Sequence, residues 1–227
     1  MADDELPEEP ELEAGDFSAW LTEVQAAIRG DGESTVPCAA CTACCTSSQF
    51  VHIRPEESDT LAHIPAELLF PAPGLPPGHV VLGYDQRGHC PMLIDHQCSI
   101  YEHRPRTCRT YDCRVFPATG VELRGTRTAL IARRVRRWRF SFPHRSDTAD
   151  YDAIRSAGAF LTDHRDRLPD AVRPLSETQL AVLAIEVHDL FLGRSTDVDD
   201  VDAHHVTPTT EAVYDEVLRH VGRRPSP

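Results

Sequence analysis

Eight cysteines, all between residues 38 and 113, constrain this chain more than any other feature of its 227 residues. They are Cys38, Cys41, Cys44, Cys45, Cys90, Cys98, Cys108 and Cys113. Two thiolates that are separated by two residues can converge on one metal ion from a tight turn, as they do in zinc ribbons and iron–sulfur loops. The first four cysteines contain this step twice in succession. The pattern therefore predicts that all eight cysteines are metal ligands.

Two other uses of these cysteines stay open. The first is a disulfide framework, which would be expected if the protein were secreted. The second is that some of the cysteines bind nothing and are buried as small apolar side chains. The vicinal pair Cys44 and Cys45 is poorly placed to bind one ion together, so it either faces two sites or divides into a ligand and a spare thiol. If the ion is zinc, the ligating sulfurs should lie about 3.5–4 Å apart, because zinc–sulfur bonds are about 2.3 Å long.

Composition argues against several classes of protein. Hydrophobic residues make up 41% of the chain and charged residues 26%, values close to those of globular domains. The net charge of -13 disfavours binding to nucleic acid or to anionic membranes. No apolar run approaches the roughly 18 residues of a spanning helix, and the acidic start lacks the apolar stretch of a secretory signal. We therefore expect a cytoplasmic protein with no membrane segment, in which metal binding is favoured over disulfides.

The chain divides into three parts by composition and periodicity. Residues 1–15 resemble a disordered acidic tail, residues 16–147 form the cysteine-cluster metal-binding domain with an N-terminal helix, and residues 148–227 form a helical C-terminal region. The predicted fold class is α+β: a small cysteine-rich metal-binding domain with short strands and loops, packed on α-helices. The expected elements of the second part are a helix at 16–29 closed by Gly30, strands near 50–53, 80–84 and 138–142, a helix that starts at 54–57, and a loop at 70–78.

Helices are expected at 149–167, 180–192 and 210–221 in the C-terminal region. The middle helix starts with a capping box, Ser176 to Gln179, and its apolar positions nearly encircle it. We expect it to be the most buried helix of a small bundle that packs on the cysteine domain. If its leucines were exposed, a protein partner would be expected to cover them.

Arginine supplies all the positive charge of the chain, and seven arginines lie between Arg124 and Arg139 with no acid among them. The simplest interpretation is a solvated edge strand protected by its charges. The alternative is that these arginines are electrostatic partners of an anionic cluster nearby.

Three sequence motifs together resemble the YkgJ-type cysteine-cluster proteins. The motifs are C-x2-C-x2-C-C at 38–45, Gly-His-Cys-Pro-Met-Leu at 88–93 and Cys-Ser-Ile-Tyr-Glu-His-Arg-Pro-Arg-Thr-Cys-Arg at 98–109. The resemblance covers about a third of the chain and implies a domain that chelates zinc or iron. Similar cysteine patterns occur in bacterial lysine-N-methylases that act on flagellin. Because the helices from residue 149 lie outside the motif, the resemblance does not imply methylase activity.

Positive side chains among the later cysteines are the next candidates. Arg104, Arg106 and Arg109, together with Tyr101, are predicted to bind the metal cofactor, because a cluster of thiolates stays anionic after two zinc ions bind. Arg114 is expected to offset the same charge.

The histidines carry less weight as ligands. His89, His96 and His103 flank cysteines and could each replace one, but a solvated loop histidine is the simpler interpretation. His204 and His205, near the acidic residues 197–202, resemble a weak metal site and are more simply read as a solvent loop.

The function expected from these features is a cytosolic metal-binding protein. Its cofactor would be zinc or iron, the iron in an iron–sulfur cluster in one version, with a structural or redox role. One alternative is an iron–sulfur-dependent oxidoreductase or a lysine-N-methylase-like enzyme, and another is an interaction module that binds a protein partner through the C-terminal helices. The sequence identifies no catalytic residue, since the common phosphate-binding, metalloprotease and nucleophile motifs are absent from it.

Overall fold

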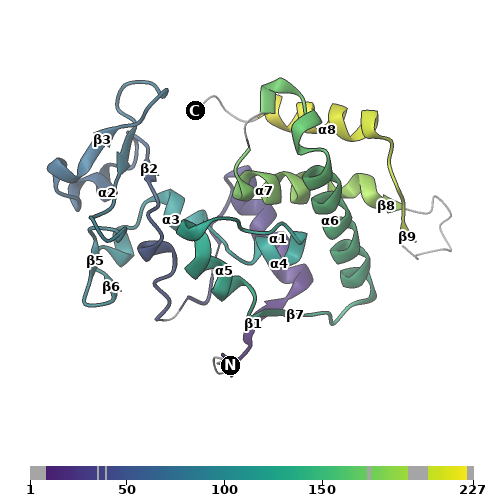
Figure 1. The fold of residues 1–227 in the computed structure, drawn as a ribbon, viewed down its shortest axis with the longest axis horizontal. Helices are drawn as coiled ribbons and strands as arrows, with labels where there is room; N and C mark the ends of the chain where they lie inside the picture. The colour runs from purple at the N-terminus through teal and green to yellow at the C-terminus, as the bar shows by residue number, and fades with distance from the viewer. Residues whose placement is uncertain (1–8, 35, 39, 173–174, 194–203, 224–227) are drawn as a thin grey trace, which may run out of the picture.

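A computed structural model describes residues 9–34, 36–38, 40–172, 175–193 and 204–223 of the chain. Its helices and short strands form two lobes (Figure 1). The architecture is α+β, as predicted. None of the helices in these residues is long and apolar enough to cross a membrane.

One lobe, the helical lobe, is built from both ends of the chain. Its elements are β1 (Leu12–Asp16), α1 (Phe17–Arg29), α4 (Val115–Thr119), α5 (Ala129–Val135), β7 (Trp138–Ser141), α6 (Arg145–Asp163), α7 (Glu177–Val187), β8 (Leu192–Gly193), β9 (His204–His205) and α8 (Thr210–Arg223). The other, the small lobe, holds only short elements. These are β2 (Val51–Ile53), α2 (Ser58–Ala62), β3 (Leu69–Pro71), β4 (Val80–Leu82), β5 (Leu93–Ile94) and β6 (Gln97–Cys98), with α3 (Arg106–Thr110) leading back to the helical lobe.

Single turns of 3-10 helix connect several of these elements. They are η1 (Cys44–Thr46), η2 (Ala66–Leu68), η3 (Tyr101–His103), η4 (Thr126–Thr128), η5 (Arg165–Arg167), η6 (Asp170–Val172) and η7 (His188–Phe191).

The predicted apolar helix α7 lies at the centre of the helical lobe. The side chain of Ser176 accepts a hydrogen bond from the Gln179 backbone, which confirms the capping box. The leucines Leu180 and Leu183 are each 1% exposed, and α7 packs on α1, α4, α6 and α8. The helix ends at Val187, earlier than predicted, and continues as η7. Because these leucines are buried within the chain, they need no partner to cover them; a partner for the C-terminal helices stays a prediction.

Helix α1 confirms the prediction for residues 16–29. It buries the side of the helix that carries Phe17, Trp20 and Val24, and it ends at Gly30, whose φ of 92° is the left-handed conformation that glycine adopts without strain.

The prediction of a disordered tail over residues 1–15 is wrong for residues 12–15. They form most of β1, which pairs in parallel with β7 from the middle of the chain. Ala14 is 1% exposed, so this strand also contributes to the core. Residues 1–8 lie outside the described residues.

Two hydrophobic clusters of very different size stabilise the lobes. The cluster of the helical lobe joins α1, α4, α6, α7 and α8. The cluster of the small lobe has five buried residues. They are Ile53, Ile64, Leu82, Met92 and Ile100. Residue 148, predicted as a domain boundary, does not separate these clusters, because α1 and α4 pack with the helices that follow it; the division into domains stays a prediction.

The main sheet of the small lobe has the order β2-β4-β3 and is antiparallel. It confirms the strands predicted near 50–53 and 80–84. The loop predicted at 70–78 is wrong at its start, because β3 extends to Pro71, which an edge strand tolerates. The helix predicted to start at 54–57 begins at Ser58 instead, since the Glu57 carboxylate accepts the Arg54 N–H at 2.8 Å and closes a turn.

Gly158 is predicted to be essential for the packing of α6 on α4. A Cβ at this position would overlap the backbone carbonyl oxygen of Thr119, which cannot move without displacing α4. Gly158→Ala should therefore lower the free energy of unfolding by about 1–3 kcal/mol, as overpacking does in a close-packed core. Chemical denaturation measures this loss. Gly222→Ala is the matched control, because a Cβ there meets nothing within 4 Å, and an equal loss in both variants would contradict the prediction.

Candidate metal centre

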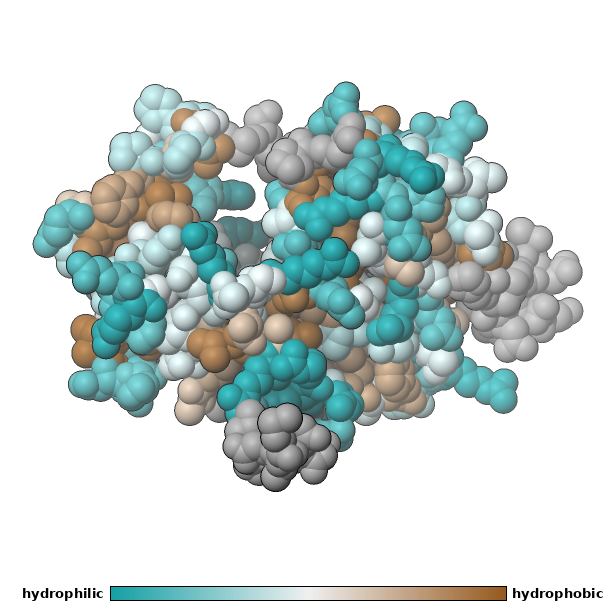
Figure 2. Space-filling view, viewed as in Figure 1, coloured by the Kyte–Doolittle hydropathy of each residue, from teal (hydrophilic) through white to brown (hydrophobic). Residues whose placement is uncertain are grey.

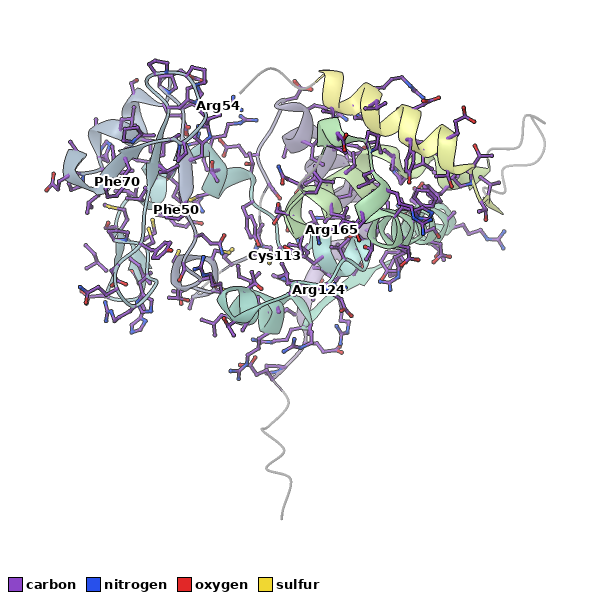
Figure 3. All side chains as sticks on the ribbon, turned by 45° about the horizontal axis from the view of Figure 1, so that its top comes forward. Phe50, Arg54, Phe70, Cys113, Arg124 and Arg165 are labelled. Carbon is purple, nitrogen blue, oxygen red and sulfur yellow. The ribbon has the colours of Figure 1, made fainter. Side chains whose placement is uncertain are left out.

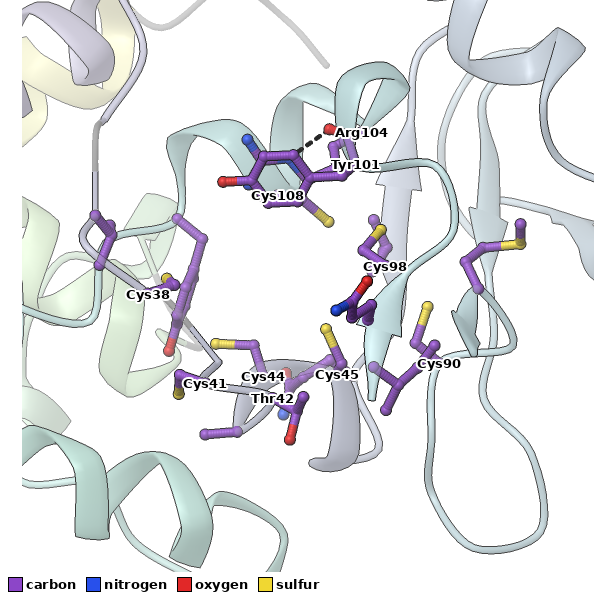
Figure 4. A pocket seen from close by; sticks show the side chains of 18 of the residues that line it. Cys38, Cys41, Thr42, Cys44, Cys45, Cys90, Cys98, Tyr101, Arg104 and Cys108 are labelled. Atoms are coloured by element: carbon purple, nitrogen blue, oxygen red, sulfur yellow. Dashed lines mark hydrogen bonds between the residues drawn. The ribbon is translucent and has the colours of Figure 1, made fainter. Parts of the chain in front are cut away.

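All eight cysteines line one cavity of about 640 Å³ between the two lobes, and Figure 4 labels all of them except Cys113. They come from four separate stretches of the chain, and each is a free thiol. The structure therefore brings together every cysteine that the sequence predicts as a metal ligand, and it pairs none of them as a disulfide.

The turn η1 sends the vicinal cysteines to opposite sides of the cavity. Figure 4 shows the sulfur of Cys44 on the side of Cys38 and Cys41, and the sulfur of Cys45 on the side of Cys90 and Cys98. Successive residues of a tight helical turn point in different directions, so adjacent cysteines on this turn serve different surroundings.

The β5–β6 hairpin positions Cys98, and the turn that follows Cys90 positions that residue. Asp95 and His96 both have positive φ, as a two-residue hairpin turn requires, and Cys98 pairs with Leu93 in the β5–β6 register. Burial raises the pKa of the Cys90 thiol, and the backbone N–H groups of Met92 and Leu93, which donate hydrogen bonds to it, oppose this rise. These donors would stabilise a thiolate at this position.

Backbone contacts then attach the neighbouring segments. The backbone N–H of Cys90 donates to the carbonyl of Cys45 at 2.7 Å. Thr107, beside Cys108 on α3, donates its hydroxyl to the carbonyl of His52 on β2. Cys90 and Cys108 are therefore held in place by contacts with Cys45 and with β2.

Cys113 belongs to the helical lobe. It is buried in that lobe's cluster, between α3 and α4 (Figure 3). Trp138 donates its indole N–H to the sulfur at 3.2 Å. Cys44 packs against the same cluster, whereas Cys90 and Cys98 pack against the cluster of the small lobe.

The effects of the cysteines on one another's pKa values also divide them into two sets, one for each lobe. After burial, the negative charges of Cys113 and Cys38 contribute most to raising the pKa of Cys44. After burial, the negative charges of Cys90 and Cys98 contribute most to raising the pKa of Cys45. We call Cys38, Cys41, Cys44 and Cys113 the helical-lobe set, and Cys45, Cys90, Cys98 and Cys108 the small-lobe set.

Burial makes most of these thiols poor acids. It raises the pKa of Cys45 to about 11 and the pKa of Cys108 to about 12, and neighbouring cysteines add to both shifts. Burial also raises the pKa of Cys113 to about 12, although the Trp138 hydrogen bond opposes the shift. The pKa values of Cys38, Cys44 and Cys90 are raised for the same first reason. At neutral pH these six groups are thiols, so metal binding has to displace protons.

The expected sulfur spacing of 3.5–4 Å is wrong for this structure. Among the residues that it describes, no three cysteine sulfurs lie within 4.8 Å of one another. The cavity is therefore wider than a four-coordinate zinc site, and the sulfurs would have to move inward to bind one ion. The donors nevertheless fit the metal in kind and number, because soft thiolates suit zinc and iron–sulfur clusters.

Of the four residues predicted to bind the cofactor, two line the cavity. The guanidinium of Arg104 lies 3.7 Å from the centre of the Tyr101 ring, and its Nε donates to the Tyr101 carbonyl at 2.8 Å. The positive charge of Arg104 lowers the pKa of Cys108 against the effect of burial. Arg106 and Arg109 are not among the lining residues. Arg109 forms an ion pair with Glu33 at 2.8 Å, and a cofactor role for these residues stays a prediction.

Arg114 has a different partner from the one predicted. It forms a buried ion pair with Asp112 at 2.7 Å, and it donates to the carbonyl of Ala14. Asp112 also accepts hydrogen bonds from the Trp20 indole at 3.0 Å and from the Ser34 hydroxyl at 2.6 Å. Sequence reasoning missed Asp112, although its place directly before Cys113 was the available signal.

Further lining residues were also missed in the sequence. Tyr111 lines the cavity, and burial raises its pKa. Arg134 lines it as well, with its guanidinium 4.8 Å from the Trp138 ring centre. Of the three flanking histidines, only His96 lines the cavity.

A separate group of possible ligands lies on the surface of the small lobe. Ligand atoms of Asp59, His63 and His103 all lie within 4.8 Å of one another. Two of the three residues are exposed, and the His103 Nδ1 lies 2.7 Å from the Asp59 carboxylate. The side chains of His204 and His205, and the acidic residues 197–202, lie outside what the structure describes.

Comparison with known proteins supports the nature of the site. No curated protein and no solved structure matches the chain. A family model named CxxCxxCC matches residues 37–128, the range that contains all eight cysteines. Its description reads "Putative zinc- or iron-chelating domain". Residues 37–128 are therefore similar to the CxxCxxCC domain, as the motifs of this part of the chain predict.

Proposed function

We propose that this protein binds zinc or iron in two four-cysteine sites, one formed by the helical-lobe set and the other by the small-lobe set. The carrying observation is that eight thiols from four stretches of the chain surround one cavity and divide at the vicinal pair. When bound, the metal would supply a fixed tetrahedral junction or a redox centre, according to its identity. We further propose that the protein works in the cytoplasm, where thiols remain reduced.

The weakness of the small lobe supports a structural role for the small-lobe set. Its strands are only two or three residues long, and its cluster has five buried side chains. Such a lobe buries too little apolar surface to be stable by itself. Zinc contributes roughly 10–16 kcal/mol to the folding of small zinc-finger peptides. Metal in the small-lobe set would therefore stabilise the fold of this lobe and join it to α3 and η1.

Metal content and colour test the proposal directly. The protein should be purified without oxygen, then analysed for zinc, iron and acid-labile sulfide and by visible spectroscopy. Zinc should give a colourless protein with about two ions per chain, whereas iron–sulfur clusters should give a brown protein with matching iron and sulfide. A protein that contains neither metal and takes up neither on reconstitution would overturn the proposal.

An iron–sulfur-dependent enzyme is the second candidate, either an oxidoreductase or a lysine-N-methylase-like protein. The observation that favours it is the size of the cavity, since about 640 Å³ is typical of a ligand pocket and exceeds the needs of two ions. Its lining includes Tyr101, Tyr111, Arg104 and Arg134, which could orient a polar ligand. Brown protein would favour this candidate, and colourless zinc protein would argue against it.

Zinc binding to the metal-free protein should release protons. Each set of four contains three cysteines whose pKa values are raised, Cys38, Cys44 and Cys113 in one and Cys45, Cys90 and Cys108 in the other, so each site must lose at least about three protons at pH 7. Apparent affinity should therefore increase with pH, by about three orders of magnitude or more per pH unit for one site. Calorimetric titration with zinc in two buffers of different ionisation enthalpy counts these protons. Uptake of zinc without proton release would show that the thiols are not the ligands.

A further inference from the structure

A strongly basic surface stands out on this acidic protein. Seven arginines lie within residues 124–139, and no acid interrupts them, although the chain has a net charge of -13. Side chains from the segment that contains η4, α5 and β7 form this surface, with Arg124 at its start (Figure 3). Buried Ile131 attaches α5 to the core, while Leu130 on the same helix is exposed.

An acidic stretch of the chain already lies on part of this surface. Glu9 pairs with Arg133 at 3.0 Å and with Arg137 at 3.3 Å, and Glu11 pairs with Arg139 at 2.8 Å. Arg137 also donates its Nε to the carbonyl of Pro10 at 2.8 Å. These arginines therefore bind both the carboxylates and a backbone carbonyl of one stretch of chain. Arginines bind an extended acidic peptide through the same two kinds of contact. Figure 2 shows a hydrophilic face where the chain enters β1.

The arginine surface can form ion pairs with more carboxylates than those of Glu9 and Glu11. Arg124, Arg127 and Arg136 are exposed, and none of them forms an ion pair within the described residues. The pairs that do form are exposed, and such pairs stabilise a structure by less than about 1 kcal/mol each. A longer acidic segment could therefore displace residues 9–11 and engage additional arginines.

This surface adjoins the first cysteine motif. A second cavity, of about 460 Å³, is lined by Glu9, Arg133 and Arg137 together with Cys38 and Cys41. The same two cysteines also line the central cavity. A segment bound to the arginines would therefore lie directly beside the helical-lobe set.

We propose that the arginine surface formed by residues 124–139 is a docking site for an acidic peptide segment of a partner protein, and that Glu9 and Glu11 compete with this segment. Charge complementarity carries the proposal, because the chain itself shows acids bound in this mode. The partner would be brought to the C-x2-C motif at Cys38 and Cys41. The proposal does not depend on which metal the cysteines bind.

The test uses full-length protein and a fluorescein-labelled peptide with the sequence of residues 1–13. In fluorescence polarisation, Glu9→Gln/Glu11→Gln should bind the peptide about fivefold more tightly than the unaltered chain, because the competing acids are neutralised. Arg133→Gln/Arg137→Gln should bind it at least tenfold more weakly. Binding should also weaken between about 50 and 300 mM salt, since exposed charges are screened.

Matched variants and probes decide the outcome. Glu13→Gln removes one carboxylate from an exposed position of β1 with no ion pair in the described residues. Arg54→Gln/Arg87→Gln removes two arginines from the small lobe. Both variants should bind like the unaltered chain. Metal content is measured for every variant, so a damaged cysteine site is recognised separately. Equal binding by all variants would overturn the proposal. So would tighter binding of a single-stranded oligonucleotide of equal charge, which would make the surface a nucleic-acid site.

Discussion

Cys44→Ser and Cys45→Ser should each remove one metal centre, and not the same one. The two sulfurs lie on opposite sides of the cavity, in different sets of four. A serine hydroxyl is a poor ligand at neutral pH, and loss of one ligand in four removes much of the free energy of metal binding. Metal content should fall from two centres to about one in each variant, and to none in the double variant.

The two variants should differ in what unfolds. Cys45→Ser should unfold the small lobe, because its five-residue cluster is too small to stabilise it alone. Cys44→Ser should leave the helical lobe folded, since that lobe has a large cluster of its own. Cys41→Ser should behave like Cys44→Ser, because both belong to the helical-lobe set. Amide hydrogen exchange reports which lobe loses protection, and elemental analysis reports the metal.

Thr42→Ala is the matched control for these serine variants. Thr42 lies inside the first motif and lines the cavity, but it offers no thiol. The variant should retain both centres and the protection of both lobes. If Cys44→Ser retained both centres, Cys44 would be a spare thiol, and the division into two sets of four would be wrong.

The sequence predicted those elements of the fold that are determined by residues close to one another along the chain. The helix that ends at Gly30 and the capping box at Ser176 follow from side chains within a few residues of each other, and both are confirmed. Pairings between distant segments gave no such signal. Strand β1 was missed because its hydrogen bonds come from β7, more than 120 residues later, and nothing in an acidic tail indicates that partner.

The same distinction applies to the candidate site. Spacing predicted all eight cysteines as ligands, and the structure places all of them on one cavity, while their binding of metal stays a prediction. Spacing could not assign them to two sets, because that depends on which way η1 turns each side chain and on which lobe contributes Cys113. It also gave no sign that Arg114 forms a buried ion pair with its neighbour Asp112.

Asp112→Ala is expected to be the most damaging substitution outside the cysteines. The Asp112 side chain is fully buried and accepts hydrogen bonds from Arg114, from Trp20 on α1 and from Ser34. Its removal would leave the Arg114 guanidinium buried without its counter-charge, a change that costs about 3–5 kcal/mol in other proteins. This loss is a large fraction of the roughly 5–15 kcal/mol by which a domain is stable.

The charge left behind, rather than the lost contacts, should account for most of this effect. Asp112→Ala/Arg114→Met should therefore be more stable than Asp112→Ala alone, because the second substitution removes the uncompensated charge. Arg87→Ala breaks an ion pair of similar length on the exposed surface, and it should cost less than about 1 kcal/mol. Denaturant unfolding at equal metal content measures all three variants. The Asp112–Arg114 pair is expected to join the segment before Cys113 to α1 and β1. An Asp112→Ala variant that lost no more free energy of unfolding than Arg87→Ala would contradict this role.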